Sequence, residues 1–277
     1  MRLIDVEHLG RQRVIGCWAL EDVLIDPGPE SSMSTLVEAL GEEQPKALLL
    51  THIHLDHAGA SGALVRRWPE LEVYVHEVGA PHLADPAKLL DSASRLYGDA
   101  MERLWGEVLP VPEANIRPLS GGEEVFGFDV VYTPGHASHH VCYLHAASRR
   151  AFVGDVAAVR IPPADYVIPP TPPPDIDIEA WESSLDAVED WRPRSLGLTH
   201  FGAVEEPQLH IAVVRRRLRE VAERAREMDA ESFERGLREE IAASTDPETA
   251  AAALQAVPPE QQFLGLDRYW RKRAEAT

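Results

Sequence analysis

The most constraining feature of the sequence is a cluster of potential metal ligands that directly follows an apolar run. Residues 47–57 read ALLLTHIHLDH, in which His52, His54, Asp56 and His57 fall within six residues. If the apolar run is a buried strand, His52 and His54 point to one side as the chain leaves the sheet, and the other two can turn toward the same region. Such a cluster would be costly to assemble without a cation. The run therefore predicts a strand that ends at a site for two adjacent cations.

Three further segments show the same pattern of an apolar run that ends in one potential ligand. VVYTPGH ends at His136, AFVGD at Asp155 and LGLTH at His200. A single histidine after a strand is more often a hydrogen-bonding residue, but ligands at the ends of several strands can converge on one edge. Imidazole and carboxylate groups together favour a transition metal. We therefore expect two divalent ions, zinc first, with iron or manganese as alternatives.

The rest of the first 200 residues alternates short strand-like runs with helical patterns, which predicts a mixed α/β layer architecture. Several of the strand-like runs are spaced closely enough for hairpins, and two sheets packed face to face are plausible. We expect helices after Ser31 and over residues 58–68, 86–108 and 178–191. These helices would cover the sheets.

A proline-rich stretch and a helical tail follow. Residues 161–175 contain seven prolines, which prevent a regular helix or a central strand. We expect a loop that borders the site, while a mere surface connection stays open. From residue 206 onward the pattern is helical, with four segments beginning near prolines or turn residues. We therefore divide the chain into a catalytic domain, residues 1–202, and a helical C-terminal extension, residues 203–277.

The amino-acid composition narrows the classes of molecule that this chain is expected to bind. Acidic residues outnumber basic ones 46 to 27, for a formal net charge of -19, which disfavours nucleic acid because binding to phosphates requires Lys and Arg. No apolar run approaches the ~18 residues of a spanning helix and no secretory leader is evident, so we expect a cytoplasmic protein without a membrane partner. Cys17 and Cys142 lack CxxC spacing and are expected to be buried apolar residues. Self-association through the tail helices stays open.

The motifs THIHLDH, TPGH, GD and the final TH, in this order, resemble the metallo-β-lactamase superfamily, and most of all its glyoxalase II-like hydrolase branch. The resemblance extends from residue 1 to about 202. It implies a four-layer αββα sandwich with the site at the open edge between the sheets. It also implies a ligand assignment: His52, His54 and His136 for one metal, Asp56, His57 and His200 for the other, and Asp155 as the bridge.

The chemistry that follows is hydrolysis. A hydroxide held between two cations forms near neutral pH and attacks without a serine or cysteine nucleophile, while a metal polarises the oxygen under attack. Asp56 would act both as a ligand and as the acceptor that orients the hydroxide. The expected partner is a small-molecule ester, thioester, lactone or phosphoester. His139, His140 and Tyr166 are candidate substrate contacts. No role is assigned to the remaining histidines, His8, His76, His82, His145 and His210.

Two alternatives stay open. One is a mononuclear iron dioxygenase acting on a persulfide, whose ligands resemble His52, His136 and Asp155. The other is a phosphodiesterase or nuclease-type member, which the charge balance disfavours. Lactonase-like members carry a tyrosine soon after the bridging aspartate, and only Tyr166 is within reach here. Flavodiiron-type members carry a glutamate where this chain has His54. The tail does not match the glutathione-binding segment of glyoxalase II, so the resemblance leaves the substrate open.

Overall fold

The computed structural model describes residues 1–275, which form two mixed β-sheets flanked by helices. The first sheet has the order β1-β2-β3-β4-β5-β6 and the second the order β12-β11-β10-β9-β8-β7. The strands of the first sheet are β1 (Arg2–Asp5), β2 (Gly16–Leu20), β3 (Val23–Ile25), β4 (Ala47–Leu49), β5 (Glu72–His76) and β6 (Ile116–Leu119). Those of the second are β7 (Glu124–Val125), β8 (Phe128–Tyr132), β9 (Val141–His145), β10 (Arg150–Phe152), β11 (Ser195–Leu198) and β12 (Gly202–Val204).

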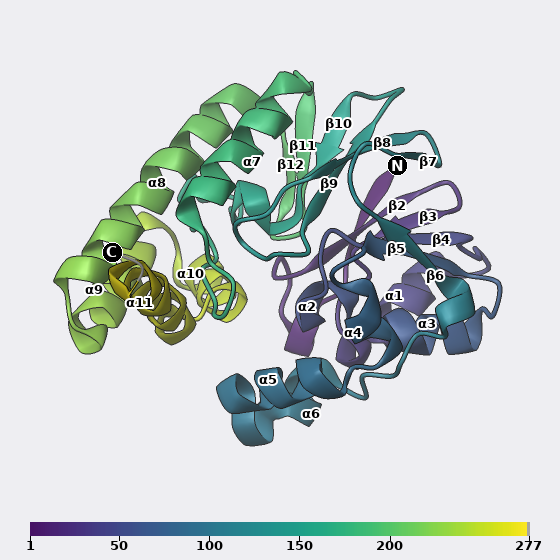
Figure 1. Cartoon of the computed structure of the whole chain (residues 1–277), viewed down its shortest axis with the longest axis horizontal. Helices are drawn as coiled ribbons and strands as arrows, with labels where there is room; N and C mark the ends of the chain where they lie inside the picture. Colours follow the sequence, from purple (N-terminus) through teal and green to yellow (C-terminus); the bar gives the residue numbers. More distant parts are fainter. Residues whose placement is uncertain (276–277) are drawn as a thin grey trace.

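Helices flank the two sheets, and several of them extend beyond the outer faces (Figure 1). They are α1 (Met33–Leu40), α2 (Leu55–Ala58), α3 (Ser61–Arg67), α4 (Ala80–Ala84), α5 (Ala87–Tyr97), α6 (Met101–Trp105), α7 (Ile178–Asp190), α8 (Pro207–Glu227), α9 (Ala230–Ser244), α10 (Pro247–Ala256) and α11 (Pro259–Glu275). Helices α1 to α4 accompany the first sheet, and α7 and α8 the second. None of the helices described within residues 1–275 has the length and apolar character needed to cross a membrane.

The side chains between the sheets form a separate hydrophobic cluster. Its members come from both sheets: Trp18, Leu20, Val23, Ile25, Ala47, Leu49, Leu119, Phe128, Val130, Val141, Tyr143 and Phe152. Strand alternation explains the division, since Leu49 of β4 lies in this cluster whereas its neighbour Leu48 lies in the cluster shared with the helices. The two sheets therefore pack face to face as the inner layers of a four-layer αββα sandwich, and the predicted fold class is confirmed.

The directions of neighbouring strands explain which of the segments that join them contain helices. β3, β4, β5 and β6 run parallel to one another, so helical crossovers join them, while β1, β2 and β3 are antiparallel. Two strands have no counterpart in the sequence prediction. β6 contains Pro118, which weakens a strand signal but is tolerated here because β6 is an edge strand. The other, β12, is only three residues long.

One predicted helix is divided in two. The expected single helix over residues 86–108 instead ends at Tyr97, and Gly98, with φ of 49°, turns the chain toward the shorter α6. The resulting pair of helices projects from the body, at the bottom of Figure 1. This helical arm, residues 87–105, forms part of the site described below.

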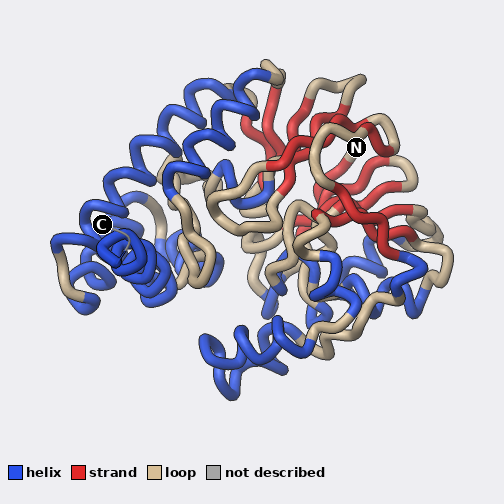
Figure 2. The backbone as a smooth tube through the Cα atoms, in the orientation of Figure 1, coloured by secondary structure: helices blue, strands red, loops and turns tan. Residues whose placement is uncertain are grey.

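The C-terminal helices follow the predicted pattern, and the proline-rich stretch is a loop without helix or strand (Figure 2). Thr171 in that loop donates through Oγ1 to the carbonyl of Gln262 on α11 at 3.2 Å.

The division of the chain at residue 202 stays a prediction, and β12 runs across that position. Cys17 and Cys142 are buried and unpaired, as expected.

Candidate metal centre

The predicted ligands lie at one open edge of the sandwich because each follows the end of a strand. His52 and His54 follow β4, and Asp56 and His57 lie on α2 immediately afterward. The other three ligands come from the second sheet: His136 lies between β8 and β9, Asp155 follows β10 and His200 follows β11. Two separate sheets thus supply the side chains of one cluster.

Glycines permit the close approach of two of these ligands. Gly135 precedes His136 with φ of 134°, and a Cβ on it would lie 2.3 Å from Cα of Trp181. Gly154 precedes Asp155 with φ of 44°, and a Cβ there would lie 2.5 Å from Oγ1 of Thr51. A side chain at position 135 would push its ligand loop away from α7, and one at position 154 would push its loop away from the loop after β4, which explains the glycines of the TPGH and GD motifs.

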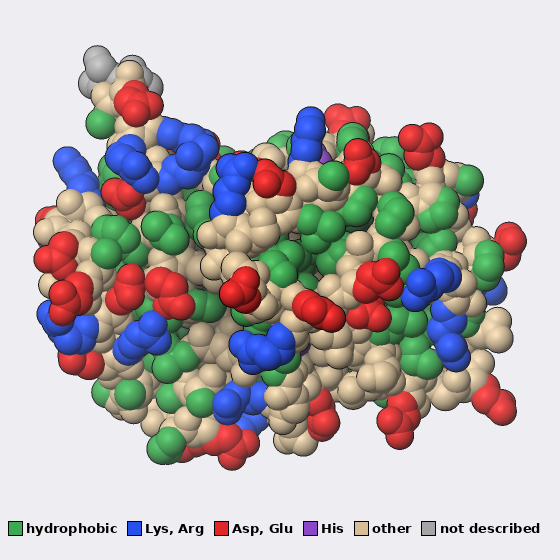
Figure 3. Space-filling view, turned by 90° about the horizontal axis from the view of Figure 1, so that it is seen from below, with side chains coloured by type: hydrophobic (Ala, Val, Ile, Leu, Met, Phe, Trp, Pro, Cys, Tyr) green, Lys and Arg blue, Asp and Glu red, His purple; other side chains and the backbone are tan. Residues whose placement is uncertain are grey.

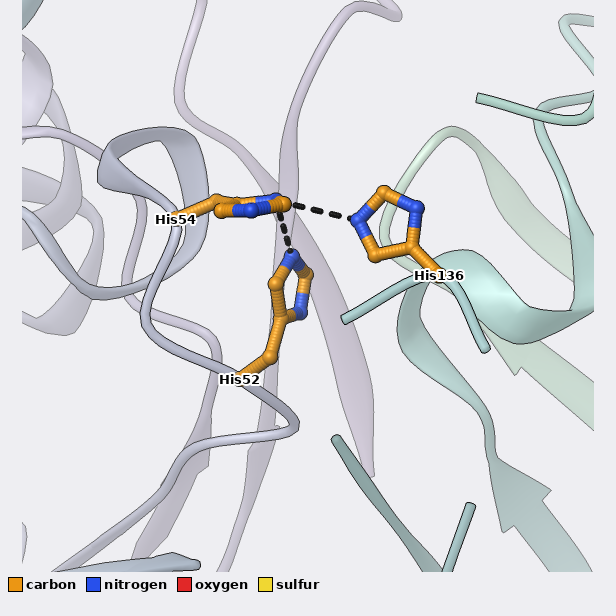
Figure 4. Close-up of side chains that lie close together, drawn as sticks. All are labelled: His52, His54 and His136. Atoms are coloured by element: carbon orange, nitrogen blue, oxygen red, sulfur yellow. Dashed lines mark hydrogen bonds between the residues drawn. The ribbon is translucent and has the colours of Figure 1, made fainter. Parts of the chain in front are cut away.

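The first triad consists of His52, His54 and His136, which point toward one another (Figure 4). Nε2 of His52 and Nε2 of His136 each lie 3.0 Å from Nδ1 of His54. The single proton that Nδ1 of a neutral His54 can carry would serve only one of those contacts. A cation would satisfy all three nitrogens at once.

The second triad consists of Asp56, His57 and His200. Nε2 of His200 lies 3.2 Å from Nε2 of His57 and 3.5 Å from Oδ2 of Asp56. The side chains of both histidines are almost fully buried, whereas that of Asp56 is 23% exposed. Two nitrogens and one carboxylate therefore converge on a second point, with the carboxylate on its open side.

Asp155 lies between the two triads. Its Oδ2 is 3.3 Å from Nε2 of His136, and its Oδ1 is 3.3 Å from Nε2 of His57 and 3.6 Å from Nε2 of His200. Oδ1 is buried and has no hydrogen-bond partner among the described residues. An unpaired carboxylate oxygen in the interior is costly, and its position between the triads suits a bridging ligand.

The far sides of the imidazoles fix which nitrogen faces the centre. Nδ1 of His136 donates to the carbonyl of Pro170 at 2.8 Å, and Nδ1 of His200 donates to the carbonyl of Val14 at 2.6 Å. Nδ1 of His57 donates to Oδ2 of Asp26 at 2.8 Å. A neutral imidazole that donates from Nδ1 presents an unprotonated Nε2, the form that binds a metal. The residues present therefore fit a pair of metal ions.

Asp26 is a functional residue that the sequence reasoning missed. Besides His57, this fully buried carboxylate accepts from the backbone nitrogen of Thr51 at 2.8 Å, from Oγ1 of Thr51 at 2.8 Å and from Oγ1 of Thr199 at 2.9 Å. It thus ties the loops after β3, β4 and β11 together behind the centre. The signal was present in the sequence, because DVLIDPG is another apolar run that ends in a carboxylate.

Opposing effects set the pKa values of the carboxylates and histidines of the centre. Burial is the largest single effect and would raise the pKa of Asp155 and of Asp56, but the neighbouring histidines, with His57 the strongest, together outweigh it and lower both. Burial and the adjacent imidazoles lower the pKa of His52 well below 6.5. Burial likewise opposes charge on His57, yet Asp155 and Asp56 raise its pKa. Metal binding requires ionised carboxylates and unprotonated imidazole nitrogens, so Asp56, Asp155 and the first triad are already in the required state, whereas His57 would release its proton on binding a metal.

A cavity of about 560 Å³ opens onto the centre. His54, Asp56, Asp155 and His200 form part of its lining, while the walls come from the helical arm, the proline-rich loop and residues 255–262. The loop therefore borders the site, as the sequence predicted. The cavity is within the size range of pockets for small molecules.

The three predicted substrate contacts differ in their position relative to the cavity. His139 lines the cavity. His140 is fully buried behind the first triad, with Nδ1 2.8 Å from Oγ1 of Thr133. Tyr166 lies outside the cavity lining, where its hydroxyl donates to Glu240 on α9 at 2.6 Å and Arg217 stacks over its ring. Of the three candidates, only His139 faces the space that a substrate could occupy.

His8 lines the same cavity, although the sequence suggested no role for it. Its ring stacks on Trp105 of α6, with ring centroids 5.6 Å apart and planes within 6°. Burial lowers its pKa to about 4, so the imidazole is neutral at pH 7. The chain brings His8 to the cavity through contact with a residue almost a hundred positions away, which no local pattern reveals.

An αββα sandwich that presents histidines and carboxylates at the open edge between its sheets defines a class of proteins built to hold metal ions. The family model described as the metallo-beta-lactamase superfamily matches residues 20–194, and the chain belongs to this superfamily. The metallo-beta-lactamase fold-containing protein ST1585 of Sulfurisphaera tokodaii is 28% identical over 189 residues, covering 66% of this chain and 69% of that protein. Its crystal structure superposes with a TM-score of 0.67 at 25% identity, covering 78% of this chain and 84% of that one.

Two further similarities bear on activity and metal content. The hydroxyacylglutathione hydrolase of Hamiltonella defensa is 38% identical over 155 residues, covering 53% of this chain but only 48% of that enzyme. The chain thus spans less than half the length of this curated relative. A structure of TTHA1623 in a di-iron-bound form superposes with a TM-score of 0.54 at 29% identity, covering 69% of this chain and 89% of that one.

Proposed function

We propose that this protein is a metal-dependent hydrolase of a small ester, thioester, lactone or phosphoester, with two divalent ions held by the two triads and bridged by Asp155. The observation that carries the proposal is the buried, unpartnered Oδ1 of Asp155 between two sets of converging ligand atoms. Zinc is the expected ion, and the di-iron form of the similar protein TTHA1623 supports iron as the alternative.

When bound, the cations would supply a hydroxide nucleophile near neutral pH and polarise the carbonyl or phosphoryl oxygen. The chain's own residues prepare this step. Asp56 is open to the cavity, so its carboxylate can accept a hydrogen bond from the attacking water and orient it. The hydrogen bonds behind His57, His136 and His200 hold the imidazoles without adjustment during the reaction.

Similarity to hydroxyacylglutathione hydrolases supports hydrolysis of a thioester or ester as the reaction class. The alternative, a mononuclear iron persulfide dioxygenase, would require only His52, His136 and Asp155. It leaves the second triad without a purpose, since Asp56, His57 and His200 also converge. The second set of ligands therefore favours hydrolysis.

The test is hydrolysis by the zinc-loaded or iron-loaded full chain on a panel of esters, thioesters, lactones and phosphoesters. Asp155→Ala should lower kcat/KM on the order of 10³-fold, because the bridging carboxylate is lost. The control is Asp165→Ala, an exposed carboxylate in the proline-rich loop, which should behave as the unchanged protein. A fully metallated protein without hydrolytic activity, or one that consumes oxygen with a persulfide, would overturn the proposal.

A further inference from the structure

The cavity has an apolar wall that faces the candidate metal centre from the helical arm. Six side chains of α5 and α6 contribute to it: Leu89, Ala93, Leu96, Tyr97, Leu104 and Trp105. The face that carries the arm is shown in Figure 3, where hydrophobic side chains gather around a hollow among scattered acidic and basic residues. Such a wall offers a substrate apolar contact but few hydrogen bonds.

The wall is held at both ends, so it is a built surface and not a loose flap. Near the body, Trp105 stacks on His8, and Oγ of Ser31 donates to the carbonyl of Leu104 at 2.6 Å. Across the cavity, the hydroxyl of Tyr97 donates to Oε1 of Gln261 on α11 at 3.3 Å. The arm is therefore tied to the segments that follow β1 and β3 and to the C-terminal helices, and its apolar side chains stay directed at the cavity.

The charges around the cavity do not suit an anion away from the metal centre. Among the described residues, Lys88 is the single lysine or arginine in the lining. Two carboxylates that are not candidate metal ligands line the same cavity: Asp175, and Glu260, which pairs with Arg238 at 2.8 Å. An anionic group placed beyond the cations would meet one flexible cation and two carboxylates.

We propose that the cavity takes an uncharged ester, thioester or lactone with a large apolar acyl group that lies along α5 and α6. This inference rests on the proposed hydrolase function and specifies its substrate class. The reacting carbonyl faces the centre, where water adds its hydroxyl to the acyl carbon, the acyl–oxygen or acyl–sulfur bond breaks, and the proton goes to the leaving group. A glutathione thioester carries negative charge beyond the centre, where the lining offers one lysine against two carboxylates.

The cavity volume supports a large acyl group. About 560 Å³ is within the range that encloses a drug-sized ligand, so an acetyl or lactoyl group would leave most of the space to water against apolar side chains. Burying each additional methylene in such a pocket is favourable. Affinity should therefore rise with acyl length.

Binding of thioethers, which cannot be hydrolysed, tests the inference separately from catalysis. Calorimetry on the zinc-loaded full chain would compare S-octyl-N-acetylcysteamine, S-methyl-N-acetylcysteamine and S-octylglutathione. The expected Kd of the first is on the order of 10²-fold below that of the second and at least about tenfold below that of the third. Equal affinities, or tighter binding of the glutathione compound, would overturn the inference even if esters are hydrolysed.

Two serines on α5 give a matched pair of variants. Ser92 lines the cavity, whereas Ser94 is exposed outside the lining and donates to the carbonyl of Asp91 at 2.9 Å. Ser92→Trp should cut the ratio of octyl to methyl affinity at least about tenfold by filling the acyl space, and Ser94→Trp should keep the ratio within about twofold. If both variants retain the ratio, the octyl group does not lie along α5.

The corresponding octanoyl and acetyl thioesters then test the hydrolase itself, and absence of any hydrolysis would count against the proposed function alone.

Discussion

At the scale of single residues, the centre depends on groups that never touch a substrate. Asp26 accepts four hydrogen bonds from His57, Thr51 and Thr199 while fully buried. It thereby fixes the His57 ring and joins its own loop to the two ligand loops that follow β4 and β11. Outer partners of this kind set the orientation and basicity of a metal-binding imidazole.

Asp26→Asn should weaken zinc binding by about 10- to 100-fold, because an amide cannot accept all four hydrogen bonds and no longer supports the imidazole of His57. Competition with a chelating dye measures the affinity, and circular dichroism checks the fold. The control is Asp22→Asn, an exposed carboxylate paired with Lys46, which should bind zinc normally. Unchanged affinity in Asp26→Asn would show that this carboxylate does not act on the centre.

His8 gives a pH prediction with a defined sign. Its pKa is about 4 in the folded protein and 6.5 ordinarily, so the unfolded state binds the proton more readily. The stability contributed by neutral His8 is fully present above pH 6.5 and is lost as the pH falls toward 4. His8→Phe keeps a ring against Trp105 without a titrating group.

Relative to this variant, the metal-free wild type should lose about 2 kcal/mol of unfolding free energy between pH 7 and pH 5. Urea unfolding of both proteins at the two pH values measures the difference. Any hydrogen bond that the substitution removes adds a constant and cancels in the comparison. A difference between the two proteins that does not change with pH would contradict the assigned burial of His8.

At the scale of elements, helix α11 packs directly against the proline-rich loop. A Cβ on Gly265 would lie 1.9 Å from the carbonyl oxygen of Thr171, so the helix and the loop backbone are in direct contact. By contrast, a Cβ on Gly236 of α9 would meet only the end of the Arg224 side chain. The loop backbone therefore leaves no room for a side chain at position 265, whereas only a movable side chain lies near position 236.

Gly265→Ala should destabilise the protein by about 1–3 kcal/mol, because it forces the loop away from the helix. Gly236→Ala should be neutral or stabilising by up to ~1 kcal/mol, since alanine favours a helix and Arg224 can move. Thermal unfolding compares the two variants. Equal effects would mean that the helix does not pack on the loop as closely as described.

The sequence predicts most elements, and its failures have physical causes. Alternating apolar runs locate most of the strands, and the αββα sandwich follows from the resemblance of four motifs. The helix expected over residues 86–108 is broken because Gly98 adopts a positive φ, and Pro118 obscures an edge strand. At the candidate centre, the seven predicted ligands come together because each follows an apolar run, whereas Tyr166 lies away from the cavity, bonded to Glu240, a partner that no local pattern reveals.

At the scale of the whole molecule, one hydrophobic cluster runs from the first sheet through α7 and α8 to the C-terminal helices. His210 of α8 also donates to the carbonyl of Ala157 beside the centre at 2.8 Å. We therefore predict that urea unfolds the chain in a single transition by both fluorescence and circular dichroism. Two separated transitions would show that the C-terminal extension folds as an independent unit.

We propose that two cations bind at the open edge of the sandwich, joined by the carboxylate of Asp155. Anomalous diffraction at the zinc edge, from crystals of the zinc-loaded protein, tests it most directly. With two bound cations, we expect two peaks flanking Asp155, one among His52, His54 and His136 and the other among Asp56, His57 and His200. Peaks elsewhere, or no peak within either triad, would contradict it.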